Sequence, residues 1–478
     1  MRGREADTSR DAAVAAAAAA FDDGRFVRDL ATLVAFPTES QNPARAEVLT
    51  AYLTEAMVPR LGAAGYTCGI FPNADPRGGP FLVAERHEGC GLPTVLTYGH
   101  GDVIHGQEGQ WRTGLEPFVL SVDGEEIYGR GTADNKGQHL INIMALEQVI
   151  AVRGHLGFNS RIIIEMSEET GSAGLAEFFG AMKDQLSADV LIASDGPRLQ
   201  PDIPTVFTGS RGAVSFDLVA DLREGAHHSG NWGGLLADPA MLIAQALALI
   251  TDARGDLRIP EWRPDSLTTD VRAALRDLPV TGDEGPGPDE DWGAPDLSLA
   301  ERAYGWNSFA VLAMTSGRPD APVNAIAGTA RATCQLRFVT GTDTAALLPA
   351  LRAVLDAHGL GRVEIRPHDE GYFPATRLVP GHPWTEFVCA SLQNTTGKRP
   401  HLLPNLAGSL PNHVFTEVLG MPTVWIPHSW RGCSQHAPDE HMRTGVCREG
   451  LEIMTGLFWD IGAADAGVPR TGAFGTAG

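Results

Sequence analysis

The sequence has few cysteines and no spacing that would pair them. Its 478 residues include six cysteines, and none of them forms a C-x-x-C pair. They are Cys68, Cys90, Cys334, Cys389, Cys433 and Cys447. A chain of this length can bury a large core without covalent links, so we expect reduced thiols rather than a disulfide framework. This disfavours the small secreted scaffolds that depend on disulfides and favours a cytoplasmic protein.

Long apolar runs and basic clusters are also missing. No stretch of about 18 consecutive apolar residues is available to cross a bilayer. The Ala-rich segment that ends at Phe21 contains acids and lacks the leucine-type core of a signal peptide. The net charge of -22, without a Lys/Arg cluster, disfavours nucleic acid or an anionic membrane as partner, because both repel an acidic chain. We therefore expect a cytoplasmic protein that binds neither.

What the sequence does contain is the composition of a packed globular protein, with 43% hydrophobic and 20% charged residues. In its first part, strand-like runs rich in Val, Ile and Leu alternate with segments that have apolar residues at helical spacing. The strand-like runs are 81–85, 94–98, 161–166 and 189–194, and the helical segments are 139–152 and 174–186. The alternation predicts an α/β fold with a mixed, largely parallel sheet and helices on both faces.

The pattern changes near residue 212 and returns near residue 379. Between these points lie strand-like runs and one long apolar helix, and an α/β pattern follows them. The runs are 213–220, 309–314 and 330–338 with a helix at 239–251, followed by a helix at 384–395, a strand at 422–426 and a helix at 443–459. We predict a first domain of residues 1–211 and 379–478, interrupted by an inserted α+β domain of residues 212–378.

Five acidic or imidazole side chains follow strand-like runs in short loops. They are His100, Asp134, Glu169, Asp195 and His436. Loops at the carboxyl ends of the strands of an open α/β sheet converge on one site. Carboxylates and imidazoles in this mixture bind divalent transition metals, and a carboxylate in the Gly-rich turn 129–137 can bridge two cations. The set predicts two divalent ions, with zinc as our first choice and manganese or cobalt as alternatives.

Two more acids have predicted supporting roles. Glu168 stands beside a predicted ligand, where a general base for the attacking water is needed. Asp102 lies two residues after His100, so if the strand continues both side chains share one face, and Asp102 can hold the second ring nitrogen of His100.

Each residue has a plainer interpretation when it is taken alone. A histidine beside an acid, such as His100 and Asp102, is often a solvated loop histidine. Glu168 and Glu169 could be the acids at a helix N-terminus, and Asp195, in Asp-Gly-Pro, could be a turn residue or a helix cap. The functional interpretation depends on their occurring together.

Five motifs occur together in order. They are H-G-D-V at 100–103, G-R-G-T-A-D-N-K-G at 129–137, S-E-E-T-G-S at 167–172, S-D-G at 194–196 and Q-H-A-P-D-E at 435–440. Together they resemble the co-catalytic metallopeptidase family that includes carnosinase-type dipeptidases, carboxypeptidase G and aminoacylases. The resemblance covers nearly the whole chain, and the stretch from Arg161 through Gly234 is most similar to the carnosinase-like branch.

The resemblance implies a role for each residue of the predicted site. The implied ligands are His100 and Asp195 on one ion, Glu169 and His436 on the other, and Asp134 shared by both. Glu168 is implied as the general base, and His436 is implied as the ligand in preference to His441.

The inserted domain resembles the family's lid and dimerisation domain. The segment A-H-H-S-G-N-W-G-G at 226–234 is similar to the family's His-Ser-Gly motif, whose histidine reaches the active site of a partner subunit. This implies a homodimer through the inserted domain, with His228 at the catalytic position and His227 as an unexpected neighbour.

The same resemblance implies a substrate pocket. Arg337 resembles the arginine that receives the substrate carboxylate, a task that suits its bidentate guanidinium. Ser409 lies in a segment similar to the family's Gly-Ser-x-Pro substrate loop, and Asn324 is implied at the same pocket.

The sequence thus predicts a dinuclear metallopeptidase that cleaves dipeptides or short peptides with a free C-terminal carboxylate. An N-acyl-amino-acid deacylase is the nearest alternative, because it uses the same ions and base, and another small-molecule amidohydrolase is a further one. A non-catalytic binding protein is the alternative of a different class. The presence of Glu168 argues against it, since a binding module needs no base.

Overall fold

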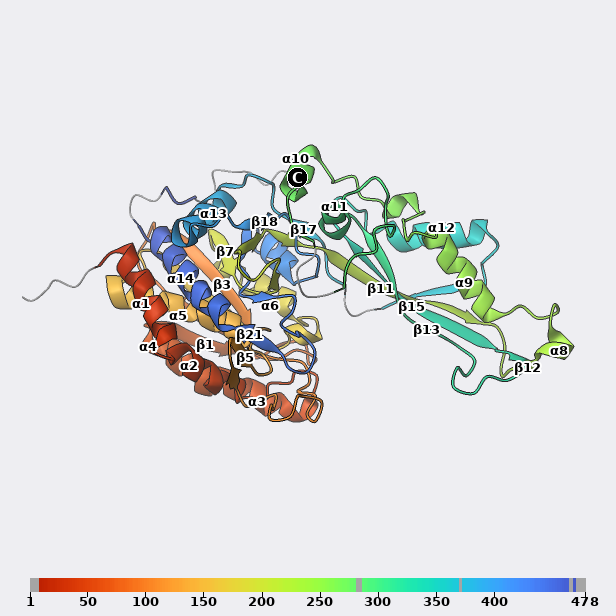
Figure 1. The fold of residues 1–478 in the computed structure, drawn as a ribbon, viewed down its shortest axis with the longest axis horizontal. Coiled ribbons are helices and arrows are strands. Elements are labelled where there is room, and N and C mark those ends of the chain that lie inside the picture. The colour runs from red at the N-terminus through yellow and green to blue at the C-terminus, as the bar shows by residue number, and fades with distance from the viewer. Residues whose placement is uncertain (1–7, 281–285, 369–371, 464–466, 470–478) are drawn as a thin grey trace, which may run out of the picture.

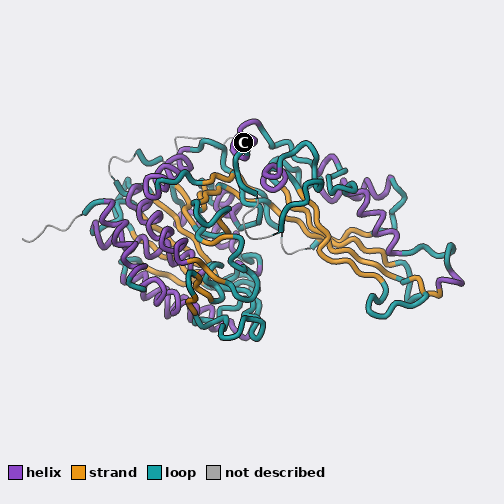
Figure 2. Tube along the Cα trace, viewed as in Figure 1, coloured by secondary structure: helices purple, strands orange, loops and turns teal. Residues whose placement is uncertain are grey.

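The computed structural model describes residues 8–280, 286–368, 372–463 and 467–469. It has two parts, which lie at opposite ends of an elongated molecule in Figure 1. The larger part contains an eight-stranded sheet, and the smaller part contains a four-stranded sheet. Figure 2 shows the strands of the larger part between helices, and the strands of the smaller part extending away from it.

The eight-stranded sheet is mixed. Its strands are β1 (Thr67–Phe71), β2 (Phe81–Arg86), β3 (Thr94–His100), β6 (Asn159–Glu165), β7 (Val190–Ala193), β9 (Thr205–Phe207), β18 (His401–Leu403) and β19 (Thr423–Trp425). They lie in the order β1-β2-β6-β3-β7-β19-β9-β18. The central strands β6, β3, β7 and β19 are parallel, whereas β2 runs antiparallel to both of its neighbours, β6 and the edge strand β1. The predicted mixed, largely parallel sheet is confirmed.

Helices cover both faces because adjacent strand residues point to opposite sides. On β6, Ile162 and Ile164 belong to one hydrophobic core and Ile163 to another. The first core is closed by α1 (Arg10–Asp22), α5 (Lys136–Arg153), α13 (Pro383–Thr396) and α14 (Thr444–Ile461). The second is covered by α6 (Leu175–Ala181) and α7 (Lys183–Leu186), among other segments.

One predicted helix is two helices in the structure. The segment 174–186 was expected to be continuous, but Met182 has φ -103° and ψ 13° and separates α6 from α7. Gly180, two residues earlier, has a low helix propensity and permits this break.

The smaller part, which we call the lid, is an antiparallel sheet with helices on one face. Its strands are β11 (Gly212–Asp221), β13 (Ser308–Ser316), β15 (Thr329–Phe338) and β16 (Glu364–Pro367), in the order β13-β15-β11-β16. The helices α9 (Pro239–Ile250) and α12 (Leu347–Ala357) enclose a third core against this sheet. At the far tip of the lid lie β12 (His227–His228), α8 (Ser229–Trp232) and β14 (Ala325–Ile326) (Figure 1).

Two short strands connect the parts. β10 (Gly209–Ser210) pairs antiparallel with β17 (Thr376–Arg377). The predicted domain boundaries near 212 and 378 lie next to this pair of strands.

Two of the expected absences can be compared with the structure. All six cysteines are free. Within the described residues, no helix combines the length and the apolar character that a membrane span requires.

Candidate metal centre

Two groups of potential metal ligands lie side by side and share one carboxylate. The first contains His100, Asp134 and Asp195, and the second contains Asp134, Glu169 and His436. Within each group, one ligand atom from every residue lies within 4.8 Å of the others. The structure therefore brings together all five residues that the sequence indicated as ligands.

Strand order explains why these residues meet. His100 is the last residue of β3, Glu169 lies in the 3-10 turn η3 (Glu168–Thr170) after β6, and Asp195 follows β7. Because β6, β3 and β7 are parallel neighbours, their carboxyl ends lie at one edge of the sheet. The other two residues come from loops, one before α5 and one before β21 (His441–Arg443).

The carboxylate of Asp134 faces both groups. Its Oδ1 lies 3.0 Å from His100 Nε2, and its Oδ2 lies 3.2 Å from His436 Nε2. His100 Nε2 is also 3.7 Å from Asp195 Oδ2, and His436 Nε2 is 3.0 Å from Glu169 Oε2. One oxygen toward each group is the arrangement of a bridging carboxylate.

Asp102 holds His100, although for a different reason than the strand pattern indicated. β3 ends at His100, so the two residues do not share a strand face. Instead His100 Nδ1 lies 3.1 Å from the backbone carbonyl oxygen of Asp102 and 3.5 Å from its carboxylate. These contacts leave Nε2 facing the acidic groups.

Asp102 has a second role that the sequence did not reveal. Its two carboxylate oxygens accept hydrogen bonds from the backbone N–H groups of Glu168 and Glu169, at 3.2 Å and 3.1 Å. This buried carboxylate thus orients the turn that carries the predicted base and a candidate ligand. No sequence spacing signals the contact, because β3 and β6 are neighbours only in the folded sheet.

The electrostatics of the site are those of crowded, buried acids. Burial and the neighbouring Asp134 raise the pKa of Glu169 to about 7 and that of Asp195 to about 6. Burial, with the nearby acids, also holds the pKa of Glu168 well above its usual value. Hydrogen bonds with Asp134 and Glu169 raise the pKa of His436 to about 11, which favours the charged form of this imidazole. The acids favour any bound positive charge.

This donor set fits two divalent cations. Within the described part of the chain, Asp134, Glu169 and Asp195 form ion pairs only with histidines, and no Lys or Arg neutralises them. Oxygen and imidazole donors suit zinc, manganese and cobalt. The residues alone do not select among these metals.

A cavity of about 530 Å³ opens beside the second ligand group. Its lining includes Glu168, His436, Arg337 and Ser409, so it joins the metal centre to the lid. Arg337 Nη1 donates a hydrogen bond to Ser409 Oγ at 3.0 Å. Among the described residues, no carboxylate pairs with this guanidinium.

Other residues that line this cavity belong to none of the sequence motifs. They include Gln41, Gln335 and Phe373. Gln335 lies two residues before Arg337 on β15, so strand alternation places both on the same face, and the sequence could have indicated it.

His228 and Asn324 do not lie at this cavity within one chain. His228 belongs to β12, which lies at the far tip of the lid (Figure 1). The residue is exposed. Its Nδ1 accepts a hydrogen bond from the N–H of Gly230 at 3.1 Å. Asn324 lies beside it, since its backbone carbonyl accepts a hydrogen bond from the N–H of Ser229. Asn324 is therefore a neighbour of His228 rather than of Arg337.

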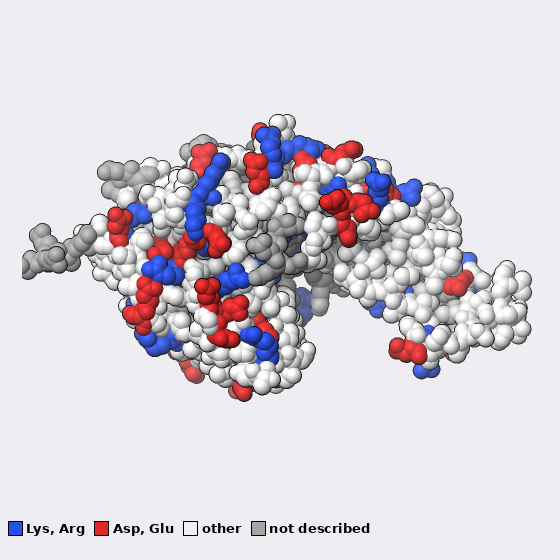
Figure 3. Space-filling model, viewed as in Figure 1, with Lys and Arg blue, Asp and Glu red and all other residues white. Residues whose placement is uncertain are grey.

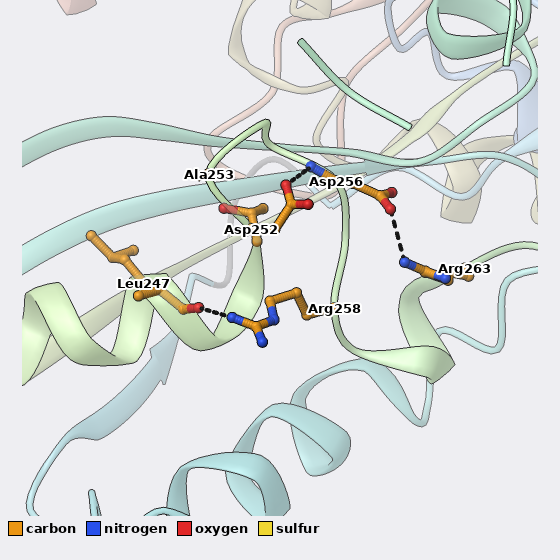
Figure 4. A pocket seen from close by; sticks show the side chains of 8 residues that line it. Leu247, Asp252, Ala253, Asp256, Arg258 and Arg263 are labelled. Atoms are coloured by element: carbon orange, nitrogen blue, oxygen red, sulfur yellow. Dashed lines mark hydrogen bonds and ion pairs between the residues drawn. The ribbon is translucent and has the colours of Figure 1, made fainter. Parts of the chain in front are cut away.

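A larger hollow of about 770 Å³ lies on the lid, near the end of α9. Its charged groups bind one another: Asp252 accepts a hydrogen bond from the N–H of Asp256, whose carboxylate pairs with Arg263 at 2.9 Å (Figure 4). Arg258 donates to the backbone carbonyl of Ala248. These groups stabilise a loop, and none of the five candidate ligands lines the hollow.

Comparison with known proteins gives the class of the chain. The sequence model described as Peptidase family M20/M25/M40 matches residues 96–460. The chain belongs to this family, which confirms the predicted family and, at the family level, the predicted enzyme class of metallopeptidase.

Two individual relatives are identical to this chain at between a quarter and a third of the aligned residues. The chain is 33% identical to human Beta-Ala-His dipeptidase over 248 residues, which cover 49% of this chain and 48% of the human protein. It is 26% identical to the Cysteinylglycine-S-conjugate dipeptidase of Corynebacterium striatum over 326 residues, covering 67% and 70% of the two chains. The match thus spans about half the length of the human relative.

The fold agrees with a solved structure over almost the whole chain. The crystal structure of human carnosine dipeptidase 1 superposes with a TM-score of 0.77 at 20% identity, covering 96% of this chain and all of that one. At this identity the likeness shows the fold.

Proposed function

We propose that the protein is a metal-dependent dipeptidase that hydrolyses the amide bond of dipeptides or short peptides with a free C-terminal carboxylate. The observation that carries this proposal is the joint lining of one cavity by Glu168, His436 and Arg337. A peptide bound there by its carboxylate would have its scissile amide near the predicted base. The dipeptidase names of the relatives support the same reaction class.

Two divalent ions, with zinc as first choice, would be held by the five candidate ligands and, when bound, would polarise a carbonyl and make water easier to deprotonate. The side chain of Glu168 makes no hydrogen bond or ion pair with the other described residues. The neighbouring acids that, together with burial, raise its pKa would be offset by two cations bound beside it, and the ionised carboxylate could then take a proton from water. The same group can then return the proton to the leaving amine. Asp102, through the backbone of Glu168, keeps this base in place.

Arg337 and Ser409 would bind the substrate carboxylate. The guanidinium is partly desolvated and burial lowers its pKa, yet no described acid neutralises it. A substrate carboxylate would satisfy it with charge-assisted hydrogen bonds. N-acyl amino acids carry the same carboxylate, so an aminoacylase-type activity is the second candidate.

We also infer a homodimer formed through the lid. β13 is an edge strand, and Val311, Leu312 and Met314 on it are exposed. Much of the visible face of the lid carries no charged side chain (Figure 3). An exposed apolar edge strand favours pairing with another chain. A second copy would give His228 an active site to reach, where it would stabilise charge on the carbonyl oxygen.

A substrate panel with a base variant tests the proposal. Wild-type protein loaded with zinc should hydrolyse dipeptides, while Glu168→Gln should bind about two ions per chain and lose at least about 100-fold in kcat, as expected for a lost general base. Glu177→Gln, which changes an exposed acid on α6, is the matched control and should keep full activity. Metal content is measured by elemental analysis and turnover by amine release.

Two results would contradict the proposal. Hydrolysis of N-acyl amino acids alone would establish the deacylase instead. Full activity of Glu168→Gln would show that another group is the base.

A further inference from the structure

Glu440 is a buried acid that lies outside both ligand groups. Its side chain is 1% exposed. Its Oε1 accepts hydrogen bonds from the backbone N–H groups of Ala133 and Asp134 at 2.9 Å and 3.0 Å, and both oxygens lie 3.1 Å from the N–H of Gly131. A single carboxylate thus binds three amides of the loop that ends at the bridging residue.

Arg130 links the same carboxylate to the loop of His436. Its Nη1 lies 2.7 Å from Glu440 Oε2, and its Nη2 donates a hydrogen bond to the backbone carbonyl of Ala437 at 3.0 Å. The backbone carbonyl of Glu440 also accepts a hydrogen bond from the N–H of Gly129. The Gly-rich loop and the loop after His436 are therefore held together by one buried ion pair and its hydrogen bonds.

The backbone around these contacts is specialised. Gly131 has φ +87°, which a side chain rarely adopts, and its N–H points at Glu440. His436 has φ +60°, an uncommon conformation for a residue with a side chain. Such conformations persist where surrounding contacts fix them.

We propose that Glu440 is a positioning residue of the metal centre, which fixes the bridging Asp134 and the loop of His436 in one geometry. The inference rests on the proposed ligand set. Glu440 touches neither ligand group's donor atoms, so its effect passes through the backbone N–H of Asp134 and through Arg130. Partners of this kind, one step removed from the ligands, commonly contribute 10- to 100-fold to metal affinity.

Zinc titration of metal-free protein tests this role. Glu440→Gln keeps the size of the side chain but places an NH2 group against N–H donors or Arg130. We expect its zinc affinity to fall about 10- to 100-fold, and its activity to recover substantially when zinc is saturating. Glu147→Gln is the matched control, because Glu147 is a largely buried acid that pairs with Arg60 at 2.8 Å and takes no part in these loops.

A purely structural role would lower the thermal midpoint of both variants and leave the zinc affinity of the folded protein unchanged. Wild-type affinity in folded Glu440→Gln would overturn the inference. If that variant does not fold, Arg130→Lys is titrated instead, since one ammonium cannot reproduce both contacts of the guanidinium. Unchanged affinity in Arg130→Lys would likewise overturn it.

Asp134→Asn distinguishes a wrong ligand set from a wrong role for Glu440. If it binds two zinc ions as the wild type does, the proposed ligand set is wrong. If it loses zinc while Glu440→Gln does not, only the positioning role fails.

Discussion

At the scale of single residues, the site depends on carboxylates that do different tasks in similar surroundings. Asp134 divides its oxygens between two histidines, whereas Asp102 uses both of its oxygens on backbone amides. Burial raises the pKa values of Glu168, Glu169 and Asp195 because it disfavours their charged forms. The hydrogen bonds with His100 and His436 outweigh burial at Asp134 and lower its pKa below the usual range.

Arg337 gives a prediction at this scale. Replacing it with Met should raise KM about 10- to 100-fold for a dipeptide with a free carboxylate, because hydrogen bonds to charged groups contribute about 1.5–3 kcal/mol. The C-terminal amide of the same dipeptide should bind equally to wild type and variant. Arg331→Met, on the same strand but paired with Asp217, is the control. Steady-state kinetics measure KM for the dipeptide and for its amide. An equal rise of KM for both substrates would contradict the proposed role of Arg337.

At the scale of elements, the tip of the lid is separated from the cavity of its own chain. β12 carries His227 and His228 at the far tip of the lid (Figure 1), while β15 carries Arg337 at the cavity beside the larger part. The two ends of the lid would therefore contribute to two different active sites only if a second chain is present.

Mixing inactive variants tests this arrangement. His228→Ala and Glu168→Gln should each be nearly inactive, but a refolded equimolar mixture should recover about a quarter of wild-type activity, since half of the dimers would have one intact site. A parallel mixture with His227→Ala identifies which histidine reaches across. Native mass spectrometry confirms mixed dimers; their presence without recovered activity would contradict a shared site.

At the scale of the whole molecule, the buried ring of His428 makes folding stability depend on pH. Its ring is fully buried, and neither ring nitrogen has a partner among the described residues. Burial, aided by nearby Arg198, holds the pKa of His428 well below its ordinary value. The folded protein therefore keeps this ring neutral, while the unfolded chain takes up a proton below about pH 6.5.

This difference predicts the pH dependence of stability. The unfolded state binds more protons, so the contribution of the neutral ring is present above pH 6.5 and is lost as the pH falls from there toward the folded-state pKa, by up to about 1.4 kcal/mol per pH unit. His428→Met should lose less stability between pH 7.5 and pH 5 than wild type or the exposed-site control His87→Met. Urea midpoints followed by tryptophan fluorescence measure this, and parallel losses would contradict it.

The sequence alone determined much of this protein. Local alternation located β3, β6, β11 and β15 to within a few residues, because burial on one or two faces leaves a pattern in the strand itself. It also indicated the five candidate ligands, since each ends or follows such a strand or lies in a short motif. Their roles as ligands, base and substrate contacts stay predictions, as does the cytoplasmic location.

Only the tertiary structure decided how these parts meet. It divided the candidate ligands into two groups around Asp134, brought Asp102 to the amides of Glu168 and Glu169, and set Glu440 against a loop some three hundred residues away along the chain. It also separated His228 from the cavity of its own chain. These outcomes depend on strand order and on loops from distant segments, and such contacts are not encoded in the spacing of any single stretch of residues.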